Sequence, residues 1–519
     1  MSAIASASSR LRLRALTWNL AAINNNPFEY WVSHDDDAYN DLMSAAAEYV
    51  KNGSNAETDA SPLIHEIFTD EMFGDLKTEM EKFGWQKEHV DATEEQWVSN
   101  LRNRKAVSGF LKDSELGAKR LISMPDRTTN TFGAHCRPTV INCYEGGDLS
   151  SIGSWWAQWR SFLFSDPVMA AARLVPVKRA KYPAVTEHEE TISLPLQTLC
   201  LAIFDAVMVN MMNSLAPGTW QTLRKDISGA LNKNKWTRTT EIMQQSYGDY
   251  EIMFLQEVSS KFIDELGESP FSTSHHIVAP SKLGKRDQNS IILLSKSAFP
   301  DAAAVKELQP LAAIKGVGDG DLVVTSAQDC RGESWILASF HGDTNGLCSN
   351  PTVAAVHELT QAEGQKAGGN LPRLLFGLDA NTHRNHKEGK VQGVDEFAAE
   401  CVALGLTSCW GDAGAGKEEY TTYNARTYLQ TQLHKACSRD AFMVKGDVNP
   451  KDSILYYKDP AAGGFFGHES TSKDNTGNTA REFVPDTPFP SMQFPSDHAV
   501  LSTTMLVSSK NDAKGSSNI

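Results

Sequence analysis

In residues 11–20, basic and apolar residues alternate before the run becomes mostly apolar. Residues 11–20 read LRLRALTWNL, with Arg12 and Arg14 between apolar residues. Alternation with a period of two is typical of a β-strand that enters a hydrophobic core. The next clear strand pattern is Glu251–Gln256, EIMFLQ. About 230 residues of a different character separate the two predicted strands.

The intervening residues carry apolar side chains at three- and four-residue spacing, which is typical of amphipathic helices. The predicted helices are Ala38–Lys51, Leu63–Phe83, Thr93–Leu111, Leu194–Leu215 and Thr219–Leu231, with an aromatic cluster at Ser154–Phe164. Thr93 is followed by three Glu and Gln residues, so we expect it to cap the start of its helix. Leu194–Leu215 is interrupted by Asp205 and two asparagines, which predicts a buried helix and no transmembrane segment.

After Glu251 the pattern changes to short apolar runs separated by turn residues, with two helical segments between them. The predicted strands are Thr273–Ala279, Ser290–Ser295, Leu322–Ser326, Trp335–Phe340, Arg373–Leu378, Ser453–Tyr457 and Ala499–Leu506; the helices are Val353–Glu363 and Val394–Leu404. Strands that alternate with helices favour a layered α/β domain. We expect this domain to comprise 11–23 and 248–507, interrupted by a helical insertion at 24–247 and followed by a disordered tail at 508–519. The alternative is two unrelated domains in tandem.

Composition and charge narrow the functional classes. The net charge is -15, whereas duplex-binding proteins usually carry a basic surface, so the charge weakens a nucleic-acid function without excluding a local basic groove. The eight cysteines form no CxxC pair, which predicts reduced thiols in an intracellular, cytoplasmic protein. The N-terminus lacks an apolar signal region, although a short organelle transit peptide stays open. The oligomeric state is not indicated.

Polar residues recur where apolar strands begin or end. They are Asn19, Glu257, His341, Asp379 with Asn381, Asp452, and Asp497 with His498. In a layered α/β protein such positions converge on a common crevice. Carboxylate oxygens suit a hard divalent cation. An Asp and an Asn two residues apart can orient water and a phosphate oxygen from one strand face, and a histidine beside an acid can offer a charged donor.

In chain order, TWN, LQE, a strand-terminal histidine, D-x-N, an acid before an apolar strand and SDH resemble the motifs of the endonuclease/exonuclease/phosphatase superfamily, which includes deoxyribonuclease I. The resemblance covers 11–23 and about 251–507. It implies a four-layer α/β/β/α sandwich of two mixed sheets with a large, mainly helical insertion after the first strand. It also implies a phosphoric-ester hydrolase that uses Mg²⁺, with Mn²⁺ as an alternative.

The resemblance implies a role for each of these residues. Asn19, Glu257 and Asp497 correspond to metal-site residues. Asp379 corresponds to the acid that aligns the attacking water, and Asn381 to the amide that holds the phosphate. His498 corresponds to the transition-state histidine, His341 to the histidine on the leaving-group side, and Asp452 to the acid that supports His498.

The sequence departs from the family pattern in three places. The segment Gly377–Asn381 is one residue longer than the usual G-D-x-N, Pro450-Lys451 replaces the usual arginine before Asp452, and the insertion is far longer than usual. Because of this long insertion, the family resemblance does not specify the substrate class. The candidates are a small or lipid-linked phosphate ester, RNA or DNA for a nuclease, or no substrate at all in a non-catalytic relative whose insertion binds a partner.

Two further sequence features bear on the substrate. Basic residues flank Trp236 at Lys233, Lys235 and Arg238, and we interpret them as solvated surface, with single-stranded nucleic acid as the alternative ligand. The polar and aromatic segment Asn24–Trp31 and the segment Thr421–Arg426 are candidates for the wall of the substrate site.

Overall fold

The computed structural model of this protein describes residues 11–121, 131–132, 135–165, 177–416, 418–458 and 466–507. The chain forms two compact units. The sandwich unit consists of Met1–Ala22, Lys235–Asn424 and Asp447–Ile519, and the helical unit consists of Ile23–Asn234 and Ala425–Gly446. The expected tail at 508–519 lies outside the described residues.

The sandwich unit contains two six-stranded mixed sheets. The first has the order β13-β14-β1-β4-β6-β5. Its strands are β1 (Leu11–Asn19), β4 (Ile252–Val258), β5 (His275–Val278), β6 (Asn289–Ser295), β13 (Phe466–Asp474) and β14 (Val500–Val507). β1 runs parallel to β4, with Thr17 beside Phe254, and antiparallel to β14. The strands that precede and follow the predicted insertion therefore pair directly in one sheet.

The second sheet has the order β11-β12-β10-β9-β8-β7. Its strands are β7 (Lys306–Leu308), β8 (Leu322–Gln328), β9 (Ser334–His341), β10 (Arg373–Asp379), β11 (Leu406–Ser408) and β12 (Asp452–Tyr457). β9 and β10 are parallel, and their register places His341 beside Asp379. β12 is antiparallel to β10, so its first residue, Asp452, also lies beside Asp379. This register alone brings three of the predicted site residues to one edge.

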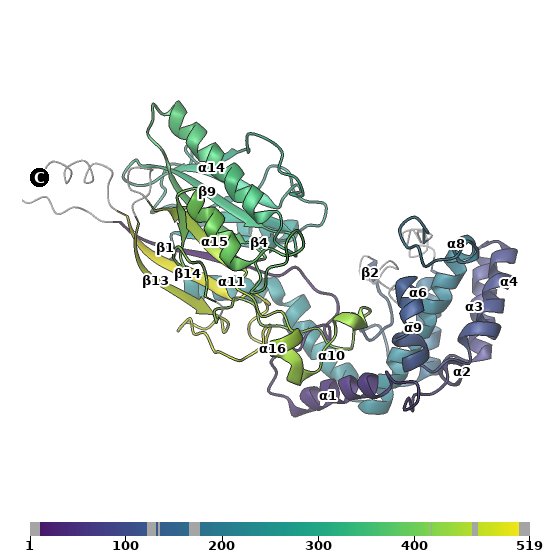
Figure 1. Cartoon of the computed structure of the whole chain (residues 1–519). Helices are drawn as coiled ribbons and strands as arrows, with labels where there is room; N and C mark the ends of the chain where they lie inside the picture. The colour runs from purple at the N-terminus through teal and green to yellow at the C-terminus, as the bar shows by residue number, and fades with distance from the viewer. Residues whose placement is uncertain are drawn as a thin grey trace, which may run out of the picture. The chain divides into compact units, whose positions relative to one another are not determined.

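A single hydrophobic core lies between the two sheets. It joins side chains of the first sheet, such as Phe254 and Ile292, to side chains of the second, such as Leu337 and Leu375. The outer face of the second sheet packs on α14 (Ser349–Lys366) and α15 (Val394–Ala403) (Figure 1). Helices α11 (Lys235–Tyr247) and α12 (Ser260–Glu268) complete the layers, and Trp236 stacks on Phe262 between them. The predicted four-layer α/β/β/α sandwich is confirmed.

The helical unit is organised around α9 (Ser193–Leu215). Its other α-helices and strands, among the described residues, are α1 (Asp37–Asn52), α2 (Ile64–Ile67), α3 (Asp70–Lys82), α4 (Lys87–Gln96), α5 (Ser114–Ala118), β2 (Thr131–Phe132), β3 (His135–Cys136), α6 (Ile152–Leu163), α8 (Glu187–Thr191), α10 (Trp220–Ser228) and α16 (Phe442–Lys445). Within the described residues, α9 is long and apolar enough to cross a membrane, but 89% of its most apolar window is buried inside the structure. Its Asp205 accepts hydrogen bonds from Thr139 and Trp159 and pairs with Arg137. These contacts provide hydrogen-bond and charge partners for Asp205, the acid that interrupts the apolar run in the sequence.

Two helix predictions in this unit were wrong in their bounds. Thr93 does not cap a helix, because α4 already begins at Lys87 and the Thr93 hydroxyl donates to His89 O. The predicted helix Leu63–Phe83 is two helices. Thr69 interrupts it because its side chain accepts a hydrogen bond from Met72 N and so starts α3.

The unit boundaries differ from the expected ranges at two places. Residues 235–247 were expected in the insertion without a predicted helix, but they form α11 in the sandwich unit, where Tyr247 donates to Asp474 at 2.6 Å. Ala425–Gly446 was expected in the α/β domain but belongs to the helical unit, where Ala425 O accepts a hydrogen bond from Trp31 N. The helical unit is thus built from two separate stretches of the chain.

Candidate active site

All eight predicted site residues lie in the sandwich unit at, or directly beside, the ends of its central strands. Asn19 ends β1, Glu257 lies near the end of β4, His341 ends β9, Asp379 ends β10, Asn381 follows it, Asp452 begins β12, and Asp497 and His498 precede β14. The parallel alignment of β1 with β4 and of β9 with β10 explains why residues so distant in sequence meet. Hydrogen bonds and close ionic contacts connect seven of the eight.

Glu257 is presented by a local irregularity in β4. Its backbone is left-handed, with φ 55°, and the pairing with β6 shifts between Leu255 and Val258. One carboxylate oxygen, Oε2, accepts from Ala22 N at 2.7 Å, and the other, Oε1, accepts from Asn19 Nδ2 at 3.1 Å. His341 Nε2 lies 3.3 Å from Oε1. A strained residue held by several partners is common at functional sites.

Asp379 is the centre of the cluster. Its Oδ2 accepts from Asn19 Nδ2 at 2.9 Å and lies 3.7 Å from Nε2 of both His341 and His498. Its Oδ1 accepts from Asn381 N at 2.9 Å. The side chain of Asn381 donates to Gly342 O at 3.1 Å, and its backbone is left-handed with φ 49°. The turn after β10 therefore fixes Asp379 and Asn381 against each other.

His498 is held from both sides. Its Nδ1 lies 2.9 Å from Oδ2 of the buried Asp452, and Trp18 Nε1 donates to its carbonyl at 3.0 Å. The Ser496 hydroxyl donates to Asn19 O at 2.6 Å, which ties the segment before His498 to the end of β1. His498 and Asp452 thus form the pair that the resemblance implies.

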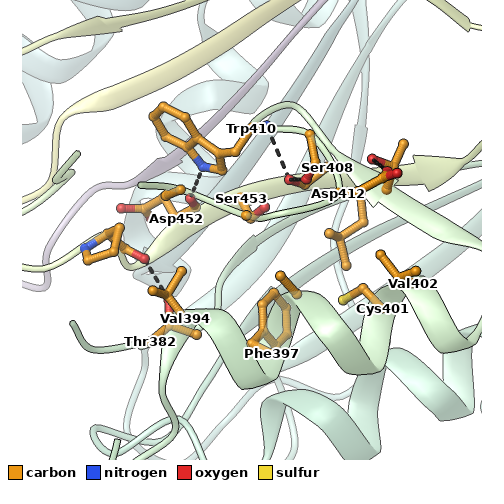
Figure 2. A pocket seen from close by; sticks show the side chains of 17 residues that line it. Thr382, Val394, Phe397, Cys401, Val402, Ser408, Trp410, Asp412, Asp452 and Ser453 are labelled. Carbon is orange, nitrogen blue, oxygen red and sulfur yellow. Dashed lines mark hydrogen bonds between the residues drawn. The ribbon is translucent and has the colours of Figure 1, made fainter. Parts of the chain in front are cut away.

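Asp452 also borders a small cavity between β12 and α15 (Figure 2). Trp410 Nε1 donates to Asp452 O at 3.0 Å on one side of this cavity, and Phe397 and Cys401 line the other. The cavity volume is about 20 Å³. A cavity of this size holds about one water molecule, so it is no substrate site.

Charge and burial shift the pKa values of this cluster. Burial lowers the pKa of His498, but the charges of Asp452 and Asp379 outweigh it and raise the pKa to about 10. His498 is therefore a cation at neutral pH, with both ring nitrogens acting as donors. Burial raises the pKa of Asp452, and the charge of His498 opposes this shift.

The pKa values of Asp497 and Glu257 shift in opposite directions. Burial raises the pKa of Asp497 and the nearby charge of Glu257 raises it further, although His498 opposes the shift. Burial also raises the pKa of Glu257, but His341 and the hydrogen bond from Ala22 N outweigh it, so the net shift is downward. Asp497 accepts from Asn424 Nδ2 at 3.3 Å.

The two six-stranded sheets, and the convergence of the sequence motifs at the ends of their central strands, identify the fold. The sandwich unit has the endonuclease/exonuclease/phosphatase fold. No curated protein matches the chain in sequence. A family model described as "Domain of unknown function (DUF8234)" matches residues 62–225, which lie in the helical unit.

The solved structures that are similar to the chain include TDP2, an endonuclease/exonuclease/phosphatase family protein and ANGEL2. D. rerio TDP2 complexed with a single-strand DNA product is 14% identical, covering 53% of this chain and 93% of its own, with a TM-score of 0.34. An endonuclease/exonuclease/phosphatase family protein from Bacteroides thetaiotaomicron is 14% identical, covering 56% and 94%, with a TM-score of 0.33. ANGEL2, a 2',3'-cyclic phosphatase, is 13% identical, covering 55% and 88%, with a TM-score of 0.37.

The site of this endonuclease/exonuclease/phosphatase fold contains groups that suit a divalent cation. Asp379, Asp452 and His498 offer ligand atoms within 4.8 Å of one another. The two ring nitrogens of His498 act as donors at neutral pH, so the carboxylate oxygens of Glu257 and Asp497 are the candidate ligands. Asn19, also predicted at the metal site, turns its Nδ2 toward Glu257 and Asp379, and its Oδ1 accepts from Ala21 N at 2.8 Å. The repulsion between Glu257 and Asp497 is the kind that a cation relieves.

Three residues near the cluster were not predicted as site residues. Lys235 was placed on the surface but is 3% exposed, and its Nζ donates to Pro495 O at 2.6 Å. Lys451 is buried and pairs with Asp447, with 2.6 Å between Nζ and Oδ2. The place of Lys451 directly before Asp452 was the only sequence signal for this pair. No local signal marks Lys235, because it lies in a run of polar and basic residues.

Proposed function

We propose that this chain is a divalent-metal-dependent hydrolase of phosphoric esters, a phosphomonoesterase or phosphodiesterase that acts by in-line attack of water. The observation that carries the proposal is the convergence of Glu257, Asp379 and His498 on one cluster from strands of both sheets. Mg²⁺ is the proposed cation, with Mn²⁺ as an alternative, because the candidate ligands are carboxylate oxygens. When bound, the cation polarises the phosphoryl oxygen and offsets its developing charge.

The residues of the chain take the remaining roles. Asp379 orients the attacking water, because its Oδ2 is the most central carboxylate oxygen in the cluster. His498, held as a cation by Asp452, donates to an equatorial phosphoryl oxygen and stabilises its charge in the transition state. Asn381 provides an amide donor to the same phosphoryl group, and His341 lies on the leaving-group side beside Glu257.

The substrate is a phosphate ester, and we favour a small or lipid-linked ester over a nucleic acid. The acidic net charge of -15 and the burial of Lys235 both reduce the cationic surface available to a polyanion. The alternative that the chain only binds a partner is disfavoured, because each catalytic residue type is present and in contact with its neighbours. We also propose an intracellular location, since all eight cysteines are free thiols.

The test is turnover of a panel of phosphomonoesters, phosphoinositides and single-stranded RNA by the full chain with Mg²⁺ or Mn²⁺. Asp379→Ala is expected to abolish turnover of every substrate that the wild type accepts. Asp264→Ala, which alters an exposed carboxylate on α12, is the matched control and is expected to retain full turnover. Unchanged turnover in folded Asp379→Ala, or no metal-dependent turnover by the wild type on any ester, would contradict the proposal.

A further inference from the structure

The helical unit contains a cavity that the proposed function does not use. Its volume is about 330 Å³, at the lower end of the range of roughly 300–1,000 Å³ for small-molecule sites. Its lining residues come from both chain stretches of this unit, Ile23–Asn234 and Ala425–Gly446, and include none of the candidate active-site residues. Asn24–Asn26 and Arg426, from the two segments that the sequence marked as candidate walls of a substrate site, are among them.

The charges in the wall of this cavity cancel each other. Glu29 and Arg426 form an ion pair, and they are the two charged residues in the lining that the structure describes. The guanidinium of Arg426 also lies 5.4 Å from the centre of the Tyr30 ring. Thr427 N donates to Glu29 O at 2.8 Å, which holds the two stretches together. Because the ion pair is neutral, the lining offers no net charge to attract an anion or a cation.

Most of the remaining lining residues carry a primary amide. They are Asn24, Asn25, Asn26, Gln430 and Gln432. Two of these amides support the wall itself. Asn24 Nδ2 donates to Glu29 Oε2 at 2.7 Å, and Asn26 Nδ2 donates to Leu429 O at 2.8 Å. Small-molecule sites are usually lined mainly by apolar side chains, whereas eight of the ten lining residues here are polar. This cavity therefore suits a ligand that is rich in hydrogen-bonding groups.

Gln430 carries the strongest indication of a ligand. It is 3% exposed, and its Nε2 donates to Thr427 O at 2.8 Å. This bond identifies the amide oxygen, because a flipped amide would bring two acceptors together. In the part of the chain that the structure describes, nothing donates to that oxygen, Oε1, and the side-chain amide of Gln432 forms no hydrogen bond. A buried acceptor without a donor is unfavourable, so the donor must come from a molecule in the cavity.

We propose that this cavity binds a neutral sugar ring, either as a free monosaccharide or as the end of a glycan. Each sugar hydroxyl both donates and accepts hydrogen bonds, which matches amides that offer a donor and an acceptor side by side. Ile23 and Ile141 add apolar contacts for the C–H groups of the ring. No aromatic side chain is among the described lining residues, which disfavours a stacked nucleobase. The inference is independent of the proposed function, because it concerns different residues in the other unit.

The test is saturation-transfer difference NMR of the full chain with D-glucose, D-galactose and D-mannose, each as the free sugar and as its methyl glycoside. Adenosine and inorganic phosphate are added as competitors, to represent a nucleobase and an anion. The variants are Gln430→Met, which replaces the amide by an apolar side chain of similar length, and Gln432→Ala. Gln86→Ala is the matched control, because Gln86 is an exposed residue of the same unit whose side chain makes no capping hydrogen bond. Circular dichroism verifies that each variant is folded.

The wild type and Gln86→Ala are expected to bind at least one of these sugars saturably and with equal affinity. Gln430→Met is expected to weaken this binding by about tenfold and Gln432→Ala by about threefold, because each removes a hydrogen bond to the ligand. Binding of the glycoside as well as the free sugar would identify the end of a glycan as the ligand. The inference would be overturned by no saturable sugar binding in the wild type, by displacement of the sugar by adenosine or phosphate, or by wild-type affinity in Gln432→Ala or in folded Gln430→Met. Should Gln430→Met not fold, Gln432→Ala alone decides.

Discussion

His498 and Asp452 form a buried ion pair, with 2.9 Å between Nδ1 of the imidazole and Oδ2 of the carboxylate. The second carboxylate oxygen, Oδ1, is buried without a hydrogen-bond partner. The contact with Asp452 orients His498, and the charges of Asp452 and Asp379 together raise its pKa. Because the opposite ring nitrogen lies 3.7 Å from Asp379, the pair delivers a positive charge to the centre of the site.

The first prediction concerns this pair directly. Asp452→Asn removes the largest influence that raises the pKa of His498, so this pKa is expected to fall from about 10 toward the ordinary histidine range near 6.5. Turnover at neutral pH is expected to fall by about 100-fold or more, because His498 then loses its positive charge. Proton NMR of the imidazole measures the pKa. A His498 pKa that stays near its wild-type value would show that Asp452 does not control its charge.

A second prediction follows for stability. The folded-state pKa of His498 is raised above its unfolded value, so its contribution to stability is full below about pH 6.5 and is lost as the pH rises through about 10. Urea unfolding of the wild type from pH 6 to pH 10.5 is expected to show this loss. His498→Gln is expected to lack that component, so the difference in unfolding free energy between the two proteins should shrink as pH rises. A difference that is constant with pH would contradict the assignment.

The grouping of the candidate site residues was predictable because each one is marked locally, by a polar side chain at or near the end of an apolar strand. Their convergence follows from the pairing of β1 with β4 and of β9 with β10, which the strand pattern and the motif order imply. The strands β8, β9, β10, β12 and β14 were predictable because they are short runs of mostly apolar residues.

The unpredicted features depend on contacts between distant residues or on strands without an apolar pattern. The burial of Lys235 comes from the segment around Pro495, 260 residues later in the chain. β13 is a mostly polar edge strand, FGHESTSKD, that pairs only with β14. β7 and β11 have three residues each, too few to show a period. The helix signal at Thr93 failed because capping residues also occur inside helices, as this hydroxyl does on His89 O.

A third prediction tests the proposed metal ligand. Glu257→Gln removes a carboxylate but keeps a side chain of similar size, so the half-saturating Mn²⁺ concentration is expected to rise by at least about tenfold. Gln288→Ala is the control, because Gln288 donates to Glu257 Oε2 at 3.3 Å from outside the proposed ligand set. Because the loss of a hydrogen bond to a metal ligand also weakens metal binding, Gln288→Ala is expected to lower Mn²⁺ affinity, but by less than Glu257→Gln does. Equal losses in the two variants would indicate that Glu257 only supports the fold.

A fourth prediction concerns the buried pair of Lys451 and Asp447 beside the site. Burial lowers the pKa of Lys451, but the charges of Asp447 and Asp379 outweigh it and raise the pKa overall. Burial raises the pKa of Asp447, but Lys451 outweighs it and brings the pKa to about 2. Lys451→Met leaves Asp447 without its cation and is expected to lower the unfolding free energy by about 3 kcal/mol. This value is at the low end for a broken buried pair because the Asp447 side chain is 33% exposed.

The double variant Lys451→Met with Asp447→Asn removes the stranded charge as well, so it is expected to recover more than half of that loss. Its measure is the midpoint and slope of urea unfolding at pH 7. The pH dependence supplies a second measure. Because the pKa of Asp447 is lowered in the folded state, its contribution to wild-type stability is present above about pH 4 and is lost as the pH falls toward about 2. A double variant no more stable than Lys451→Met would show that the lysine acts through its packing and not through its charge.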